Sequence, residues 1–385
     1  MRHAVAEPLP GAPEPWAPSE MPAFRSRPPY LMSEMIAAEP ALAERLMRRL
    51  AADESLGALA STAREAISAG QPILTTGCGT SEHAAMGIAT LLNDALDLPA
   101  GREVRAVQAL ETLRRPLREG LLIAVSHEGG TRITNEALGA ARESGARTAL
   151  ITVGGGSPGA TLAEIVIRTE EQDRSWCHTV GYLAPLVVGV MLAARLTRKR
   201  PDAAAIRAVL DVAEDAHAAA AIAPALSEID RLIVAGSGPD YVTARELALK
   251  MAEGARLAAD AHELETVLHG HLAAANRWTG IVLVLTDGST PAAVDRARTL
   301  LGAAKALGAT AAAILAESTD AQIPAEDTPA GRIVLPRTGR VPPLTGSLLA
   351  SAIALQLLTE RLARARNVNP DTLGREDAAQ AAAHA

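Results

Sequence analysis

The chain has 385 residues, which is more than one ordinary core accommodates and favours two domains of about 150 residues each. Its net charge of −7 and its lack of an arginine-rich run with interleaved aromatic residues argue against a nucleic-acid partner. The two cysteines, Cys78 and Cys177, have no CxxC spacing, so neither a disulfide framework nor a cysteine metal site is expected, and a cytoplasmic location is the simpler interpretation.

The first 29 residues are rich in proline and contain no apolar segment typical of a signal peptide. Since proline disrupts helices and strands, residues 1–29 are predicted to form a disordered arm. No uninterrupted run of about 18 apolar residues occurs, so no membrane span is expected. The folded part is predicted to begin at an N-terminal helical segment, residues 30–54, in which an amphipathic helix runs from Met32 to about Ala52.

Strands and helices then alternate. Apolar runs that end in glycine-rich turns predict three strands, in the segments 72–85, 121–134 and 148–156. Helical patterns follow the first two, at 86–96 and 135–144. This β-α-β-α-β order predicts a parallel sheet with right-handed crossovers.

The same order returns in the second half of the chain, with strands predicted in LIVAGSGPDYVTA, IVLVLTDGSTPAAV and ATAAAILAE. Gly79 and Ser126 are 47 residues apart, and Gly238 and Thr286 are 48 residues apart. A coincidental alternation of strands and helices is the alternative, but the shared spacing favours a duplicated lobe. The predicted fold class is α/β, with domains at residues 55–205 and 206–365 and a C-terminal tail, 366–385.

Two turns carry residues suited to anion binding. Ligands of open parallel sheets bind beyond the carboxyl ends of the strands, where glycines allow backbone to approach and hydroxyls donate hydrogen bonds. The first turn contributes Gly77, Gly79, Thr80 and Ser81, and the second contributes Ser126, Gly129, Gly130 and Thr131. The alternative is that Thr80 and Ser81 merely cap their helix.

The segment EQDRSWCHTVGY, residues 171–182, is too polar for a core element and is predicted to be a loop that faces the ligand. Its candidate ligand-binding residues are Trp176, His178 and Thr179. A surface loop whose tryptophan packs on the sheet is the alternative. Cys177 has no local feature other than His178 to lower its pKa, so it is not expected to be a nucleophile.

One helix is predicted to run from Tyr241 to about Leu268, and Glu246, Lys250 and Glu253 share one of its faces. They form either a catalytic face or a solvated salt-bridge stripe. A loop with His269 and His271 follows, and histidine suits proton transfer near neutral pH. No third ligand stands beside this HxH pair, so no metal is expected.

On these residues the chain resembles the sugar isomerase (SIS) family, and within it the isomerase half of the glutamine:fructose-6-phosphate aminotransferases. The family turns CGTS and SQSGET are similar to residues 78–81 and to Ser126, His127, Glu128, Gly129, Gly130 and Thr131. The resemblance implies two tandem SIS-type three-layer αβα lobes with flavodoxin-like parallel sheets. It also implies that Thr80, Ser81, Ser126 and Thr131 bind phosphate, whereas Glu128 places a carboxylate at a position where the family has serine.

The family's EGALKLKEIS helix and HGP loop are similar to ELALKMAEGA and HGH, and the first glutamate precedes the histidine by 23 residues. The resemblance implies that Glu253 moves a proton between sugar carbons, that Lys250 and Glu246 organise the site, and that His269 opens the sugar ring across a dimer interface. Residues 366–385 contain Arg375 but no lysine, so Schiff-base chemistry through a C-terminal lysine is not expected, and neither is a glutaminase half.

The expected function is therefore aldose/ketose isomerisation, or deamination or deglycation of an amino-sugar phosphate, by proton transfer without a metal or organic cofactor. The expected partners are a small phosphosugar or amino-sugar ligand and a second copy of the chain. The alternative is a non-catalytic SIS module that senses a sugar ligand. Glu128 and the missing lysine favour that alternative, whereas the absence of a helix-turn-helix segment argues against a transcription regulator.

Overall fold

The computed structural model describes residues 7–383. Within this range the chain forms two compact units. The first lobe comprises the chain up to Glu20, Ala38–Asp173 and Val180–Arg207. The second lobe comprises Met21–Ala37, Arg174–Thr179 and the chain from Ala208 onward.

The sheet of the first lobe is parallel and has the order β2-β1-β3-β4-β5. Its strands are β1 (Ile73–Thr76), β2 (Arg105–Ala106), β3 (Leu121–Val125), β4 (Arg147–Thr152) and β5 (Ile165–Arg168). One helical layer contains α2 (Glu54–Ala69), α3 (Thr80–Leu96) and α7 (Val180–Thr197), and the other contains α4 (Ala109–Arg114), α5 (Arg132–Glu143) and α6 (Pro158–Leu162). The strands β1 and β3 are buried along their whole length, as expected for a sheet covered on both faces.

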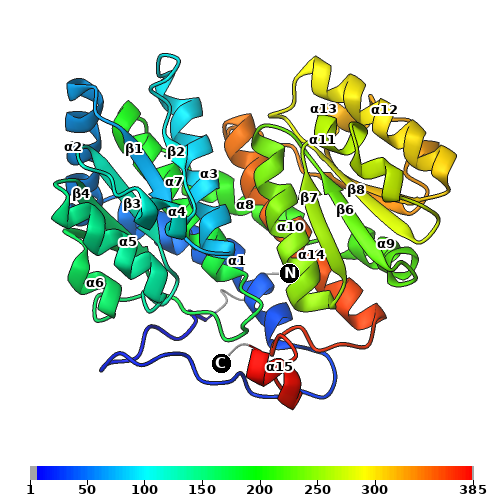
Figure 1. The fold of residues 1–385 in the computed structure, drawn as a ribbon, viewed down its shortest axis with the longest axis horizontal. Helices are drawn as coiled ribbons and strands as arrows, with labels where there is room; N and C mark the ends of the chain where they lie inside the picture. The colour runs from blue at the N-terminus through cyan, green and yellow to red at the C-terminus, as the bar shows by residue number, and fades with distance from the viewer. Residues whose placement is uncertain (1–6, 384–385) are drawn as a thin grey trace. The chain divides into compact units, whose positions relative to one another are not determined.

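The second lobe repeats this design with the sheet order β10-β9-β8-β6-β7. Its strands are β6 (Arg231–Ala235), β7 (Ala258–His262), β8 (Thr279–Leu285), β9 (Thr310–Ala316) and β10 (Gly331–Leu335). One layer contains α9 (His217–Ser227), α10 (Pro239–Ala255) and α14 (Pro343–Ala365), and the other contains α11 (Leu264–Leu268), α12 (Pro291–Leu307) and α13 (Glu317–Asp320). Figure 1 shows α10 and α12 on opposite sides of this sheet.

The predicted fold class is confirmed, because both lobes are three-layer αβα units whose strands follow the flavodoxin-like order 2-1-3-4-5. The remaining elements are α1 (Leu31–Leu50), α8 (Ala203–Ala213), α15 (Ala378–Ala383) and the short 3-10 helices η1 (His271–Ala274) and η2 (Ala325–Asp327). Three strands per lobe were predicted and five are present. The additional strands, β2, β5, β7 and β10, lie at or next to the sheet edges, where apolar patterning is weak.

The prediction of one continuous helix from Tyr241 to Leu268 is wrong. The helix α10 ends at Ala255, and Arg256 follows it in a left-handed conformation with φ of 53°. The next residues form β7, which pairs in parallel with β6. Alanine-rich sequence favours a helix locally, but pairing with a neighbouring strand overrides that preference.

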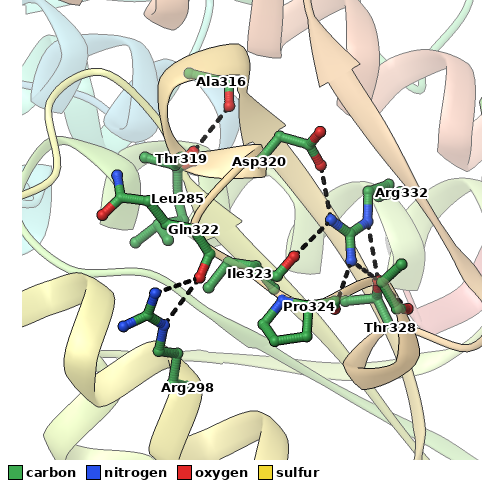
Figure 2. Close-up of polar contacts among 11 residues, drawn as sticks. Leu285, Arg298, Ala316, Thr319, Asp320, Gln322, Ile323, Pro324, Thr328 and Arg332 are labelled. Atoms are coloured by element: carbon green, nitrogen blue, oxygen red, sulfur yellow. Dashed lines mark hydrogen bonds and ion pairs between the residues drawn. The ribbon is translucent and has the colours of Figure 1, made fainter.

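A network of polar contacts fixes the connection between β9 and β10 (Figure 2). The guanidinium of Arg332 donates to Asp320 at 2.7 Å, to the carbonyl oxygens of Ile323 and Pro324, and to Thr328 at 2.6 Å. A single arginine therefore satisfies several acceptors of an irregular segment, which lets a connection without long helices keep one conformation.

The helix α7 is long and apolar enough to cross a membrane, with a mean hydropathy of 1.7 over 18 residues. However, 78% of that window is buried inside the structure, and α7 packs against α3. These properties are typical of a core helix in a three-layer fold.

Candidate functional site

The two predicted ligand turns of the first lobe lie beside each other. They leave the carboxyl ends of β1 and β3, which are adjacent and parallel, with Thr76 opposite Ala124. Strand order reverses between these two strands, which is where ligands bind in such sheets. A contact of 3.6 Å between Cys78 Sγ and Thr134 Oγ1 joins the first turn to the helix that follows the second.

In the first turn, backbone packs tightly at the beginning of α3. A Cβ atom on Gly77 would lie 2.6 Å from the carbonyl group of Ser81, so only glycine fits there. The N-cap is Gly79, with φ of 57°, so Thr80 and Ser81 are residues of the first helical turn and not its cap. The alternative role for these two residues is therefore wrong, and the turn presents a helix N-terminus with adjacent hydroxyls.

The second turn brings its two hydroxyls together. Ser126 Oγ donates to Thr131 Oγ1 at 3.2 Å, and Thr131 is exposed at the beginning of α5. Gly129 has φ of 71°, and Ser157 leaves no room for a side chain there. The exposed Thr131 hydroxyl therefore lies on the same edge of the sheet as the first turn, with the buried Ser126 hydroxyl donating to it.

His127, a predicted ligand-binding residue, has a structural role within the first lobe. It is buried, its Nε2 accepts a hydrogen bond from the backbone N–H of Asp173 at 3.0 Å, and its carbonyl oxygen accepts from Val153. Burial lowers the pKa of His127, although Asp173 and Glu128 act in the opposite direction. A neutral imidazole that accepts through Nε2 ties the second turn to residue 173.

Glu128, also predicted to bind the ligand, contacts the N-terminal residues. Its Oε2 accepts from the backbone N–H of Ser19 at 3.2 Å, and its Oε1 accepts from the Gln172 amide at 3.4 Å. Its carbonyl oxygen accepts from Trp16 Nε1 at 3.0 Å. Residues 7–29 contain no helix or strand, but these contacts hold part of them in place, in contrast to the predicted disorder. Proline content alone does not report such tertiary contacts.

In the second lobe, a carboxylate occupies the equivalent position. Asp240 follows Gly238 as Ser81 follows Gly79, and it accepts hydrogen bonds from the N–H and hydroxyl of Thr286, at 3.1 and 2.5 Å, and from the Ser289 hydroxyl. Burial raises the pKa of Asp240, while these hydrogen bonds oppose the shift. The buried Asp240 thus accepts from the donors of its own lobe, a role that was not predicted from the sequence.

The face of α10 that carries Glu246, Lys250 and Glu253 is a buried charged cluster, so the alternative of a solvated stripe is wrong. Lys250 Nζ lies 2.6 Å from Glu253 Oε2 and 3.5 Å from Glu246 Oε1. Burial acts to lower the pKa of Lys250, but Glu253 and Glu246 outweigh it and raise the pKa. Glu253 is the most accessible of the three and is half-buried, with 25% of its side chain accessible.

The segment 174–179 packs against this cluster and against the C-terminal residues. A Cβ atom on Gly254 would lie 3.1 Å from Cys177 Sγ, and burial raises the pKa of Cys177, as expected for an inert thiol. The guanidinium of Arg375 lies over the Trp176 ring, with Arg375 Cζ 4.5 Å from the ring centroid. The carbonyl of Thr179 accepts from Gln356, and His178 is half-buried.

His269 is exposed, with 76% of its side chain accessible, and its Nε2 lies 3.2 Å from Glu265 Oε2. It lines an open hollow of about 800 Å³ in the second lobe. The other lining residues are Arg231, Glu265, Thr266, Gly270, His271, Ala273 and Ala274. His271 stacks on His262 with ring centroids 3.7 Å apart.

Known proteins share this architecture. The chain is 28% identical over 236 residues to a glutamine–fructose-6-phosphate aminotransferase of Halobacterium salinarum, a match that covers 56% of this chain and 38% of that protein. The chain therefore spans less than half the length of this curated relative.

Two solved structures have the same fold. The C-terminal domain of glucosamine-fructose-6-phosphate aminotransferase from Francisella tularensis superimposes with a TM-score of 0.75 at 19% identity, covering 91% of this chain and all of that one. The tagatose-6-phosphate ketose/aldose isomerase of Escherichia coli has a TM-score of 0.71 at 19% identity, covering 92% and 98% of the two chains. The SIS domain model matches residues 67–195 and 225–360, one segment in each lobe, so the resemblance inferred from the sequence is confirmed and the chain belongs to the SIS domain family.

Proposed function

We propose that this chain is an enzyme that binds a phosphosugar or amino-sugar phosphate at the first-lobe turns and isomerises or deaminates it by proton transfer between C1 and C2. The observation that carries the proposal is the convergence of two hydroxyl-bearing turns, 77–81 and 126–131, at the point where strand order reverses. Relatives named as phosphosugar isomerases and aminotransferases support this ligand class.

Proton transfer from carbon needs a positioned base, and Glu253 has the chemistry of one. Its carboxylate is held by Lys250 and is the accessible member of the charged cluster. In the proposed reaction, Glu253 takes the proton from the carbon next to the carbonyl, an enediol forms, and the proton returns to the neighbouring carbon. With an amino sugar the intermediate is an enaminol, and the imine that forms at C2 is hydrolysed by water to the ketone with release of ammonia. His269 would protonate the ring oxygen as the ring opens, and its exposure is compatible with contact to another molecule, including a second copy of the chain.

The substitution Glu253→Gln tests the base. The glutamine keeps the shape and can still accept from Lys250, so ligand binding is expected to persist while turnover falls by about 10²- to 10⁴-fold. The measurement is exchange, in deuterated water, of the C1 proton of fructose 6-phosphate and of the C2 proton of glucosamine 6-phosphate. Glu111→Gln, at an exposed carboxylate of α4 paired with Arg114, is the matched control. Undiminished exchange in E253Q would exclude Glu253 as the base.

A second candidate function is a non-catalytic sugar sensor. Two observations favour it: the carboxylate of Glu128 in the second turn, and Arg375 in a C-terminal segment that has no lysine. A sensor would bind the same ligands with no exchange of the C1 proton of fructose 6-phosphate or the C2 proton of glucosamine 6-phosphate, in either the native chain or E253Q. The same assay therefore separates the two functions.

A further inference from the structure

Residues 9–19, here called the N-terminal strap, cross the loops at the carboxyl ends of the first-lobe strands. Leu9, Ala12, Trp16 and Ser19 are half-buried at regular intervals of three and four residues, whereas most residues between them are exposed. The strap therefore presents one side to the lobe along its whole length.

Glycines make room for this approach. A Cβ atom on Gly130 would lie 2.8 Å from Trp16 Cζ2, and one on Gly154 would lie 2.6 Å from the Ala12 Cβ. These glycines follow β3 and β4, so the strap lies directly on the second ligand turn and on the loop next to it. A side chain at either glycine would displace it.

Two acids fasten the strap at its ends. Glu171, which also pairs with Arg45 at 2.8 Å, accepts from the backbone N–H of Leu9 at 3.1 Å. Glu128 accepts from Ser19 and, through its carbonyl oxygen, from Trp16. Between them, the backbone N–H of Gln172 donates to the carbonyl oxygen of Pro10 at 2.8 Å.

The position of Glu128 gives these contacts a consequence for ligand binding. It belongs to the same turn as Ser126 and Thr131, so a Glu128 carboxylate without these contacts could turn toward an anion that the hydroxyls bind. A like charge about 5 Å away in a partly wet site weakens binding by about tenfold. Both carboxylate oxygens are engaged instead by Ser19 and by the Gln172 amide, which itself donates to the Ser19 hydroxyl at 3.0 Å.

We propose that the N-terminal strap is part of the anion site: by holding the Glu128 carboxylate against Ser19 and Gln172, it keeps that charge away from the phosphate group of the ligand. Trp16 and Ser19 are then positioning residues, and release of the strap frees Glu128 to oppose the ligand. The inference rests on the proposed ligand site of the first lobe, but it does not require turnover.

The test is a double-mutant cycle in the full chain. Calorimetry measures the Kd of fructose 6-phosphate and of inorganic phosphate for the native protein, W16A, E128Q and W16A/E128Q, and hydrogen exchange follows residues 7–20. W16A should raise the Kd about tenfold and increase exchange of the strap. E128Q should bind at least as tightly as the native protein, and the double variant should match E128Q, because no charge remains to be released.

W278A is the matched control, since Trp278 is a 48% exposed tryptophan of the second lobe and should leave the Kd unchanged. Deletion of residues 1–19 replaces W16A if that variant does not fold. An unchanged Kd with a freely exchanging strap would overturn the inference. Equal weakening by W16A in the native and E128Q backgrounds would also overturn it, because the strap would then act independently of the Glu128 charge.

The outcomes separate this inference from the proposed enzyme activity. The expected pattern of Kd values without exchange of the C1 proton of fructose 6-phosphate or the C2 proton of glucosamine 6-phosphate would support the role of the strap and overturn the isomerase. The opposite result is exchange of carbon-bound protons on unphosphorylated sugars, with no binding of phosphate or sugar phosphate to any of these proteins. It would overturn the role of the strap and would still support catalysis of proton transfer.

Discussion

Single acidic residues distinguish the two lobes of this protein. In the first lobe, Ser81 leaves the turn at the end of β1 free to donate hydrogen bonds, whereas in the second lobe Asp240 supplies the acceptor itself. Asp240 is 3% exposed and holds Thr286 and Ser289. A carboxylate in place of a hydroxyl therefore replaces a potential anion site with a set of internal hydrogen bonds.

The hydrogen bonds that Asp240 accepts should make a measurable contribution to the free energy of unfolding. Asp240→Ala leaves the buried N–H of Thr286 without its acceptor and should lower the free energy of unfolding by about 1–3 kcal/mol in denaturant titrations. Because burial raises the pKa of Asp240 above an unfolded value of about 4, the folded state keeps its proton longer, and the contribution of Asp240 to stability falls as the pH rises. The stability of D240N relative to the native protein should then improve from about pH 4 upward. A pH-independent difference would contradict the raised pKa.

At the scale of elements, the C-terminal segment caps the N-terminus of α1. The carboxylate of Asp371 accepts from the backbone N–H groups of Leu31 and Met32, both at 2.8 Å, so a residue 340 positions away provides the N-terminal acceptor of α1. The segment also carries Arg375, which covers Trp176. A tail that is polar in sequence is thus a structural part of the second lobe.

Asp371→Ala should therefore destabilise the protein by about 1–2 kcal/mol, because it removes both acceptors and a negative charge from a helix N-terminus. Hydrogen exchange should rise first in the opening turn of α1. Asp371→Asn keeps one acceptor and should lose less. If exchange at residues 31–34 rose no more than in the rest of the second lobe, the capping role would be excluded.

At the scale of the whole molecule, duplication has produced two sheets of the same order with separate cores. Leu74, Leu122 and Leu150 pack together in the first lobe, and Ile233, Ile281 and their neighbours form the core of the second. Within residues 7–383, the first lobe has hydroxyls at its glycine turns where the second lobe has the buried Asp240 carboxylate, so the lobes are alike in architecture and unlike in chemistry.

This difference between the lobes predicts that a ligand binds at the turns of the first lobe. Fructose 6-phosphate at 100 times its Kd should stabilise the folded state by about 2.7 kcal/mol and slow hydrogen exchange in residues 77–81 and 126–131. The turn at residues 236–240 should show no change, because Asp240 already satisfies it. Protection of both turns alike would argue against a ligand site confined to the first lobe.

The amino-acid sequence by itself determined the α/β class and the duplication, and it located the two turns that follow the adjacent strands β1 and β3. Apolar runs, glycines and the spacing of 47 and 48 residues are local features that survive without tertiary information. The continuous helix beyond Ala255 was predicted wrongly, because an edge strand such as β7 exists only through its partner. The contact of Ser19 with Glu128, over 109 residues, and the tie between Asp240 and Thr286 were decided by the tertiary structure, since hydrogen-bond acceptors find distant donors only when the chain is folded.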